Sequence, residues 1–309
     1  RREIDLLKRR LDAAQEELQQ ERTSRIVFET QIRVATLRGL PVGTPLAVAG
    51  LTREVLVELI EQSIEEQYPG AKFELSNWIY QYFGALPEDL DMRRFMTDLM
   101  EEQAGGLYDP KTKKLYVAPS FDIEGALGQM ILAHEINHAL QDQYFDLVEM
   151  GLLDSGNGDR SLAMLAAIEG DATLLMGEMT LGMNPLTVLA DLPKMLMIDQ
   201  RKLNAAPAVI TESLLFPYTS GAAFYNQLRG RTRERPTGPL IGQASPSWRS
   251  QILADPPVST EQVLHPEKYL AGELPAEIEQ PTPPAGATAC SRSARTARGS
   301  CSRSGNASA

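Results

Sequence analysis

The chain has 309 residues, a formal net charge of −11 and 43% hydrophobic residues. This length and composition can bury a substantial core, in one large domain or in two smaller lobes. The acidic balance argues against a nucleic-acid partner and offers no basic footprint for a membrane surface. No run of about eighteen apolar residues occurs, so the sequence predicts no membrane span.

Residues 1–36 are expected to form an amphipathic helix ahead of the folded body. Apolar residues recur there at alternating spacings of three and four: Ile4, Leu7, Leu11, Ala14 and Leu18. This stripe predicts either a short coiled coil, with self-association through residues 1–21, or a helix packed on the body. Because the chain begins with Arg1 and not with Met, it is expected to be processed or truncated.

Residues 37–183 are predicted to form an α+β lobe within a mostly helical chain. Apolar periodicity and turn residues indicate a strand, three helices or helical segments and a hairpin. These elements cover residues 46–48, 52–67, 73–83, 91–102 and 107–117. A further helix is predicted over residues 122–144, directly after the hairpin.

This last helix carries the most informative motif, H-E-x-x-H at His134-Glu135-Ile-Asn-His138, which uses two of the three histidines. On a helix, histidines four residues apart lie on one face and can bind a single Zn²⁺ ion. Glu135 points toward the open coordination position, where it could take a proton from a water. Apolar residues share the stripe of the histidines, which therefore face the interior and need partners for their ring nitrogens.

A third ligand is expected on the next helix, since catalytic zinc usually takes three protein ligands and a water. The helix predicted over residues 161–179 carries Glu169 in the middle of an otherwise apolar stripe, where an unpaired carboxylate is costly. We therefore expect His134, His138 and Glu169 to hold Zn²⁺. The alternative is that Glu169 is buried and bonded to an arginine or a backbone group. Glu178 lies off this stripe, near the helix end.

Three further acidic features lie near these two helices. Asp171 and Asp142 could each orient an imidazole by a hydrogen bond, or they could be ordinary solvated side chains. The loop at residues 154–159, Asp-Ser-Gly-Asn-Gly-Asp, could hold Ca²⁺, although a plain polar turn is the simpler interpretation.

The H-E-I-N-H motif followed by Glu169-Gly170-Asp171-Ala172 resembles the gluzincins, the zinc metallopeptidases that include thermolysin and aminopeptidase N. The resemblance implies a zincin-like fold, with a small sheet, an active-site helix and a helical C-terminal lobe. It also implies Zn²⁺-dependent hydrolysis of a peptide or protein substrate, with Glu169 completing the zinc site. Pro217-Tyr218-Thr-Ser-Gly221 is similar to the P-Y-x-x-G element of aminopeptidase N-like enzymes, and by this resemblance Tyr218 stabilises the oxyanion.

The resemblance also sets limits on specificity. No G-x-M-E-N signature precedes the zinc helix, so an aminopeptidase activity does not follow. In zincin folds a strand ahead of the zinc helix forms the sheet edge to which an extended peptide adds itself, and the predicted hairpin suits that position. A wider likeness to uncharacterised bacterial zinc-peptidase-like proteins covers roughly residues 37–275 and favours an extracytoplasmic or secreted location. It includes Leu37-Arg-Gly-Leu-Pro41 and the segment Ser259 to Tyr269.

His265 is the third histidine of the chain. Pro266 disfavours helix at the residue before it, so His265 is expected in a turn or loop. Three interpretations stay open: a transition-state hydrogen-bond donor beside Tyr218, a third zinc ligand in place of Glu169, or a loop histidine bonded to the backbone.

Residues 184–280 are predicted to form a helical C-terminal lobe, with the substrate in the cleft between the lobes. Prolines are expected to break its helices: Pro185, Pro193, Pro207 and Pro217. Residues 281–309 change abruptly to a Ser/Arg/Ala mixture that should be disordered and suggests a frameshift product. Both cysteines, Cys290 and Cys301, lie in this tail, so the body is expected to fold without disulfides.

The sequence thus predicts a zinc metallopeptidase in which Glu135 is the general base, Tyr218 the oxyanion donor and His265 a candidate catalytic residue. Two rival interpretations stay open. One is a catalytically inactive zincin-fold protein that binds or scaffolds at the bacterial envelope. The other is a non-catalytic envelope protein whose histidines are structural and bind no metal.

Overall fold

The computed structural model describes residues 2–67, 72–103, 105–119, 121–151, 157–196, 201–231 and 247–277. By its internal contacts the chain divides into two units, Arg1–Pro275 and Ala276–Ala309. Residues 281–309 and part of the loop at 154–159 lie outside the described residues. The disorder and the calcium site expected there therefore stay predictions.

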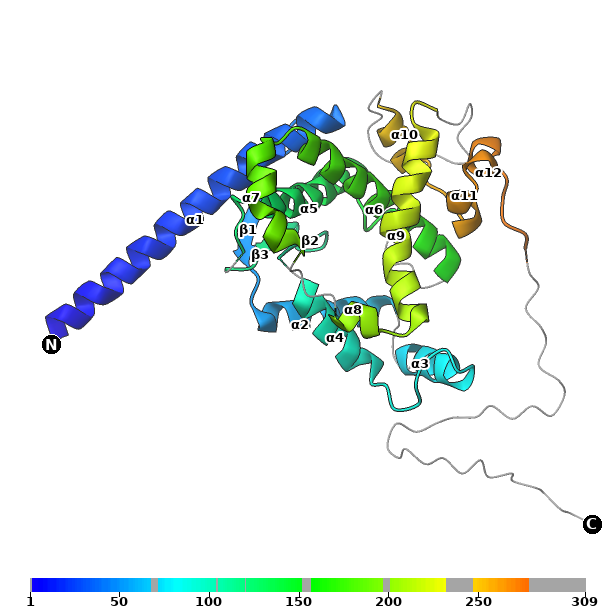
Figure 1. The fold of residues 1–309 in the computed structure, drawn as a ribbon, viewed down its shortest axis with the longest axis horizontal. Helices are drawn as coiled ribbons and strands as arrows, with labels where there is room; N and C mark the ends of the chain where they lie inside the picture. Colours follow the sequence, from blue (N-terminus) through cyan, green and yellow to red (C-terminus); the bar gives the residue numbers. More distant parts are fainter. Residues whose placement is uncertain are drawn as a thin grey trace, which may run out of the picture. The chain divides into compact units, whose positions relative to one another are not determined.

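The described residues are mostly helical and contain a small sheet, which confirms the α+β class (Figure 1). The helices are α1 (Arg2–Arg38), α2 (Arg53–Gln67), α3 (Lys72–Tyr82), α4 (Met92–Gln103), α5 (Ala126–Phe145), α6 (Gly158–Leu181), α7 (Pro185–Leu196), α8 (Arg201–Ala205), α9 (Ala208–Leu228), α10 (Trp248–Ala254), α11 (Thr260–Leu264) and α12 (Pro266–Ala271). The strands are β1 (Ala47–Gly50), β2 (Gly106–Asp109) and β3 (Lys114–Val117).

The sheet has the order β1-β3-β2, with β3 parallel to β1 and antiparallel to β2. The predicted hairpin is therefore confirmed, and β2 is an edge strand. Its turn is stabilised by Asp109, whose carboxylate accepts the backbone N–H groups of Lys111 and Thr112. Lys113 completes the turn at a φ of 55°, in the left-handed region.

Helices cover both faces of the sheet. On one face, Tyr108 and Leu115 pack in a buried cluster with Ile136 of α5. On the other face, Tyr116 packs against Leu56 of α2. Side chains of a strand alternate between its two faces, so consecutive residues of the hairpin pack alternately toward α5 and toward α2.

The helix that carries the H-E-x-x-H motif begins later than the sequence pattern predicted. α5 starts at Ala126, because Asp122 accepts the N–H groups of Glu124 and Gly125 in a turn that precedes it. The helix is buried along most of its length, as the two apolar stripes indicated. α6 packs against both α5 and α9 (Figure 1).

The prediction that Pro217 breaks a helix is wrong. Pro217 is buried inside α9, which continues for eleven residues beyond it to Leu228. The proline removes one backbone hydrogen bond from the helix. Packing of the C-terminal half of α9 in a buried cluster, through Phe224 and Tyr225, outweighs that loss. Pro193 likewise lies inside α7, whereas Pro185 opens α7 and Pro207 caps α9.

α1 is one continuous helix with two different surroundings. In its first half the apolar stripe is exposed: Ile4, Leu7, Leu11 and Leu18. In its second half, Val27, Val34 and Ala35 are buried in the cluster that includes α5. Self-association through residues 1–21 stays a prediction. No helix among the described residues has the length and apolar composition to cross a bilayer.

Candidate metal centre

Two helices bring three side chains with metal-binding atoms together. α5 supplies the imidazoles of His134 and His138, and α6 supplies the carboxylate of Glu169. The two Nε2 atoms are 3.0 Å apart. Glu169 Oε2 lies 3.0 Å from Nε2 of His134 and 3.2 Å from Nε2 of His138. The three residues predicted as ligands therefore converge on one point.

This donor set fits a zinc ion. Ligands bound at roughly 2.0–2.1 Å to a tetrahedral zinc lie about 3.3 Å apart, which is close to the spacing of the three donor atoms. Two imidazoles and one carboxylate also form catalytic zinc sites that keep a further position open. The exposed fractions of the side chains are 12% for His134, 11% for His138 and 13% for Glu169, so a ligand from solvent can reach the cluster.

Gln141 determines which nitrogen of His138 faces the cluster. Its Nε2 donates to the carbonyl oxygen of Ile168 at 3.0 Å and to Asp171 Oδ2 at 2.8 Å, and neither oxygen can donate in return. Its Oε1 therefore faces His138 Nδ1, at 2.9 Å, and that nitrogen must carry a proton. In a neutral His138 the Nε2 lone pair then points into the cluster, which is the tautomer that metal binding requires.

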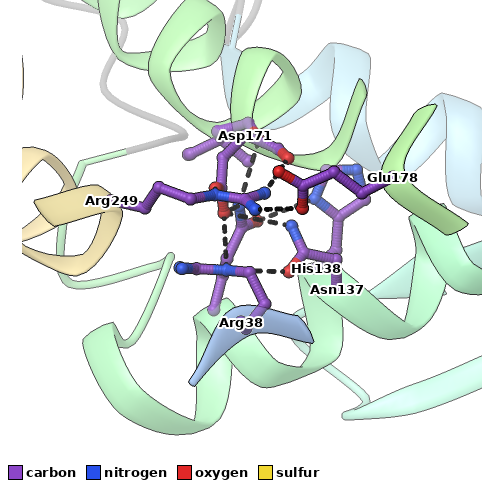
Figure 2. Close-up of polar contacts among 8 residues, drawn as sticks. Arg38, Asn137, His138, Asp171, Glu178 and Arg249 are labelled. Carbon is purple, nitrogen blue, oxygen red and sulfur yellow. Dashed lines mark hydrogen bonds and ion pairs between the residues drawn. The ribbon is translucent and has the colours of Figure 1, made fainter. Parts of the chain in front are cut away.

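Asp171 of α6 is fully buried beside Arg38, Asn137 and Arg249 (Figure 2), and it also holds the amide of Gln141 in place. Its Oδ1 accepts from Arg249 Nε at 2.6 Å, and its Oδ2 lies 3.1 Å from Arg38 Nε. Asn137 Nδ2 also donates to Oδ2, at 3.1 Å. One carboxylate thus joins α1, α5, α6 and α10. Two guanidinium groups compensate a charge that burial alone would disfavour, and the link from Asp171 to the cluster runs through Gln141.

Charge balance shifts the pKa values of these groups. Burial opposes the charge on Asp171, but Arg249 and Arg38 outweigh it and hold the pKa of Asp171 at about 2. Burial also opposes the charge on His138, yet the Glu169 carboxylate raises the pKa of His138 to about 9. The pKa of Glu169 falls well below its usual range, because the two imidazoles outweigh its burial. The cluster therefore favours positive charge, as a metal site must.

The prediction that Asp142 could orient an imidazole is wrong. Its carboxylate accepts from the hydroxyl of Tyr108 at 2.6 Å and from Lys113 Nζ at 2.8 Å, both in the β2–β3 hairpin. Its Oδ1 also accepts the backbone N–H of Leu147. Asp142 therefore fastens the β2–β3 hairpin to α5, the helix that also carries Glu135.

Glu135 is anchored to the edge strand. The backbone N–H of Tyr108 donates to Glu135 Oε2 at 2.8 Å. In the register of the hairpin, the backbone groups of Leu107 and Asp109 hydrogen-bond to β3. The N–H of Tyr108, between them, therefore points outward from the edge of the sheet. Burial raises the pKa of Glu135, which suits a carboxylate that accepts a proton near neutral pH.

Tyr218 of α9 lies beside the cluster. Its ring stacks on that of His134, with centroids 6.0 Å apart. Burial and the carboxylate of Glu169, with which the hydroxyl interacts, raise the pKa of Tyr218. The hydroxyl therefore stays protonated and can donate a hydrogen bond. The residue as a whole is 40% exposed, so part of Tyr218 can contact a ligand at the cluster.

Two glycines allow α6 and α9 to approach closely enough for this arrangement. A Cβ atom on Gly170 would overlap the backbone of Gly221, and one on Gly221 would overlap the carbonyl oxygen of Ala166. Gly170 directly follows Glu169, and Gly221 lies three residues after Tyr218. Backbone contact between the helices therefore sets the position of the tyrosine relative to the glutamate.

Two candidates from the sequence lie in other surroundings. His265 sits between α11 and α12, is 54% exposed, and has its Nδ1 3.6 Å from Glu267 Oε1. Glu178 pairs with Arg249 at 2.8 Å and so belongs to the network around Asp171. In the part of the chain that the structure describes, neither residue joins the metal-binding cluster.

Local sequence patterns did not identify the residues that surround the cluster of His134, His138 and Glu169. Gln141 lies three residues after His138, so its place on the same helix face was an available signal. Arg38 belongs to the Leu37-Arg-Gly-Leu-Pro41 element, but the sequence assigned it no function. No sequence pattern singled out Arg249. Both arginines come from helices distant in sequence, so only the fold brings them to Asp171.

Comparisons with protein-family models, curated protein sequences and solved structures gave no match to this chain.

Replacing Gln141 with leucine is expected to weaken zinc binding about 10- to 100-fold, because His138 loses the acceptor that fixes its tautomer. The dissociation constant is measured by competition with a chelator. Gln143→Leu is the matched control, since Gln143 lies on the same helix, is exposed and donates to the carbonyl oxygen of Thr44. Equal zinc affinity in the two variants would contradict the role assigned to Gln141.

Proposed function

We propose that this chain is a zinc-dependent peptidase of the gluzincin type with a zincin-like architecture. The observation that carries the proposal is the convergence of His134, His138 and Glu169 beside an anchored Glu135. A metal at this cluster would be held by two imidazoles and one carboxylate. When bound, zinc polarises a scissile carbonyl and lowers the pKa of an attacking water.

The edge strand supports a peptide as the substrate. Gly106 and Tyr108 alternate along β2 with the residues that bond to β3, so their backbone groups face the outer edge of the sheet. Glu135 accepts the N–H of Tyr108 at this edge. An extended peptide can add to such an edge as a further strand, through main-chain hydrogen bonds. A scissile bond would then lie alongside both the metal ligands and the general base.

The protein side chains divide the chemistry between them. Glu135 accepts a proton from the attacking water and passes it to the leaving amine. The hydroxyl of Tyr218, protonated and next to His134, donates to the oxyanion that develops on the carbonyl. Gln141 and Asp171 hold His138 in the ligand tautomer throughout.

Zinc content is the first test. Native mass spectrometry of the purified chain should show one zinc ion, and Glu169→Ala should weaken zinc retention at least about 100-fold because it removes a direct ligand. Glu178→Ala is the control, since it removes another α6 glutamate that pairs with Arg249 instead. A parent chain that binds no zinc, even when zinc is supplied, would overturn the proposal. Zinc retained equally in the two variants would remove Glu169 from the site.

Hydrolysis of a broad peptide library by the zinc-loaded chain separates the peptidase from a zincin-fold binding protein. Cleavage that is lost when a chelator removes the metal supports the peptidase. Full zinc occupancy with no cleavage of any peptide would favour the binding protein.

A further inference from the structure

An apolar cavity of about 390 Å³ lies between α2, α3, α4, β2 and the first turns of α9. Its volume is in the range of sites that bind small organic groups, roughly 300–1,000 Å³. Side chains that line it include Ile60, Phe73, Met92, Met96, Leu107 and Leu214. The described lining residues include no Asp, Glu, Lys, Arg or His. A charged group would lose its hydration there without gaining a partner, so the cavity suits an apolar occupant.

The cavity adjoins the candidate metal centre through two of its lining residues. Leu107 is joined by a peptide bond to the Tyr108 nitrogen that donates to Glu135. Leu214 lies one helical turn before Tyr218, and residues four apart share a helix face. One wall of the cavity is therefore the edge strand beside the general base, and another is the helix that carries the tyrosine.

The alternation of side chains along a strand relates this cavity to a substrate. Tyr108 faces α5, whereas Leu107 packs with the α2 cluster on the opposite face of the sheet. A peptide added to the edge of β2 would direct every second side chain to the face of Leu107. That face opens on the cavity.

We propose that this cavity binds a large apolar side chain of the peptide substrate, aromatic or long aliphatic, next to the cleaved bond. The inference rests on the proposed peptidase function and adds the substrate class. Met92 and Met96 are flexible and polarizable, so the cavity can adapt to side chains of different shape. The preference applies to alternate residues of the peptide, because the intervening side chains point toward α5.

Binding to the zinc-loaded Glu135→Gln chain tests the proposal without requiring turnover. The probes are labelled alanine-based peptides in which a single phenylalanine or asparagine occupies each position in turn. At one position, or at two positions separated by one residue, phenylalanine should bind about 10- to 100-fold more tightly than asparagine. Benzoylphenylalanine at that position should photo-cross-link to Met92 or Met96.

Ser213→Trp supplies the matched variant, because Ser213 lines the cavity from the exposed side of α9 and an indole there would fill it. This variant should bind the phenylalanine and asparagine peptides equally. Glu212→Trp, one residue earlier, does not line the cavity and should keep the preference. Equal binding of the two peptides at every position, or cross-links only to other parts of the chain, would overturn the proposal.

The experiments distinguish an error in the assignment of the cavity from an error in the proposed peptidase function. Hydrolysis by the parent chain with no apolar preference would refute the cavity assignment and leave the peptidase intact. Tight binding of the phenylalanine peptides with no hydrolysis by the parent chain would leave the cavity intact and refute the peptidase.

Discussion

Replacement of Asp171 by alanine is expected to lower the free energy of unfolding by about 3–5 kcal/mol. The carboxylate is fully buried and compensates Arg38 and Arg249, so its loss leaves two guanidinium groups in the interior with too little opposite charge. Arg249 keeps its ion pair with Glu178, whereas Arg38 keeps a hydrogen bond to the neutral side-chain oxygen of Asn137. Urea denaturation followed by circular dichroism measures the change.

Two further variants distinguish the stability lost with a buried charge from the stability lost with an ordinary surface ion pair. Asp171→Asn preserves the shape and one acceptor oxygen, so its loss of stability should be smaller than that of the alanine variant. Glu124→Ala removes an ion pair with Arg22 in which both side chains are 51% exposed, and it should cost less than about 1 kcal/mol. A loss in Asp171→Ala no larger than that of Glu124→Ala would contradict the structural role of the network.

In Glu135→Gln, peptide hydrolysis is expected to fall by about 10²- to 10⁴-fold while zinc stays bound. The glutamine amide cannot accept the proton of the attacking water. Its oxygen can still accept the N–H of Tyr108, so the local structure should persist. Initial rates on a library-derived peptide give kcat and KM, and mass spectrometry of the same sample gives the zinc occupancy.

A loss of hydrolysis with unchanged zinc occupancy would support Glu135 as the general base. Loss of activity together with loss of zinc would mean that Glu135 supports the metal cluster and does not act as a base. Retention of full activity would exclude it from proton transfer. Glu124→Gln is a suitable control, because that carboxylate is exposed and paired with Arg22.

The convergence of His134, His138 and Glu169 was predictable because each of the three residues follows a local rule. The spacing of His134 and His138 places both on one face of a helix, and Glu169 interrupts an apolar stripe that a carboxylate would otherwise avoid. The hairpin was predictable from its turn residues, and Thr52 caps α2 as expected, by accepting the N–H of Val55. All of these signals depend on residues within one or two helical turns of each other.

The remaining features depend on tertiary contacts that local patterns do not contain. Asp142 and Gln141 both lie about one turn after His138, and the choice between them is made by Tyr108 and Lys113, which attract Asp142 to the hairpin. Arg38 could be recognised as buried only once α1 was known to pack against α5. Pro217 could be placed inside α9 only from the packing of the helix beyond it.

The glycine contact between α6 and α9 bears on how this site could diversify. Since the main chains of Gly170 and Gly221 touch, the approach of α6 and α9 beside Glu169 and Tyr218 leaves no room for a side chain at either glycine. The first turns of α9, which line the apolar cavity, contain no glycine. Under the proposed function, directed evolution would therefore randomise the lining residues Val209, Ile210, Ser213 and Leu214 to obtain new selectivity. Gly221 would be kept constant, so that Glu169 and Tyr218 retain their spacing.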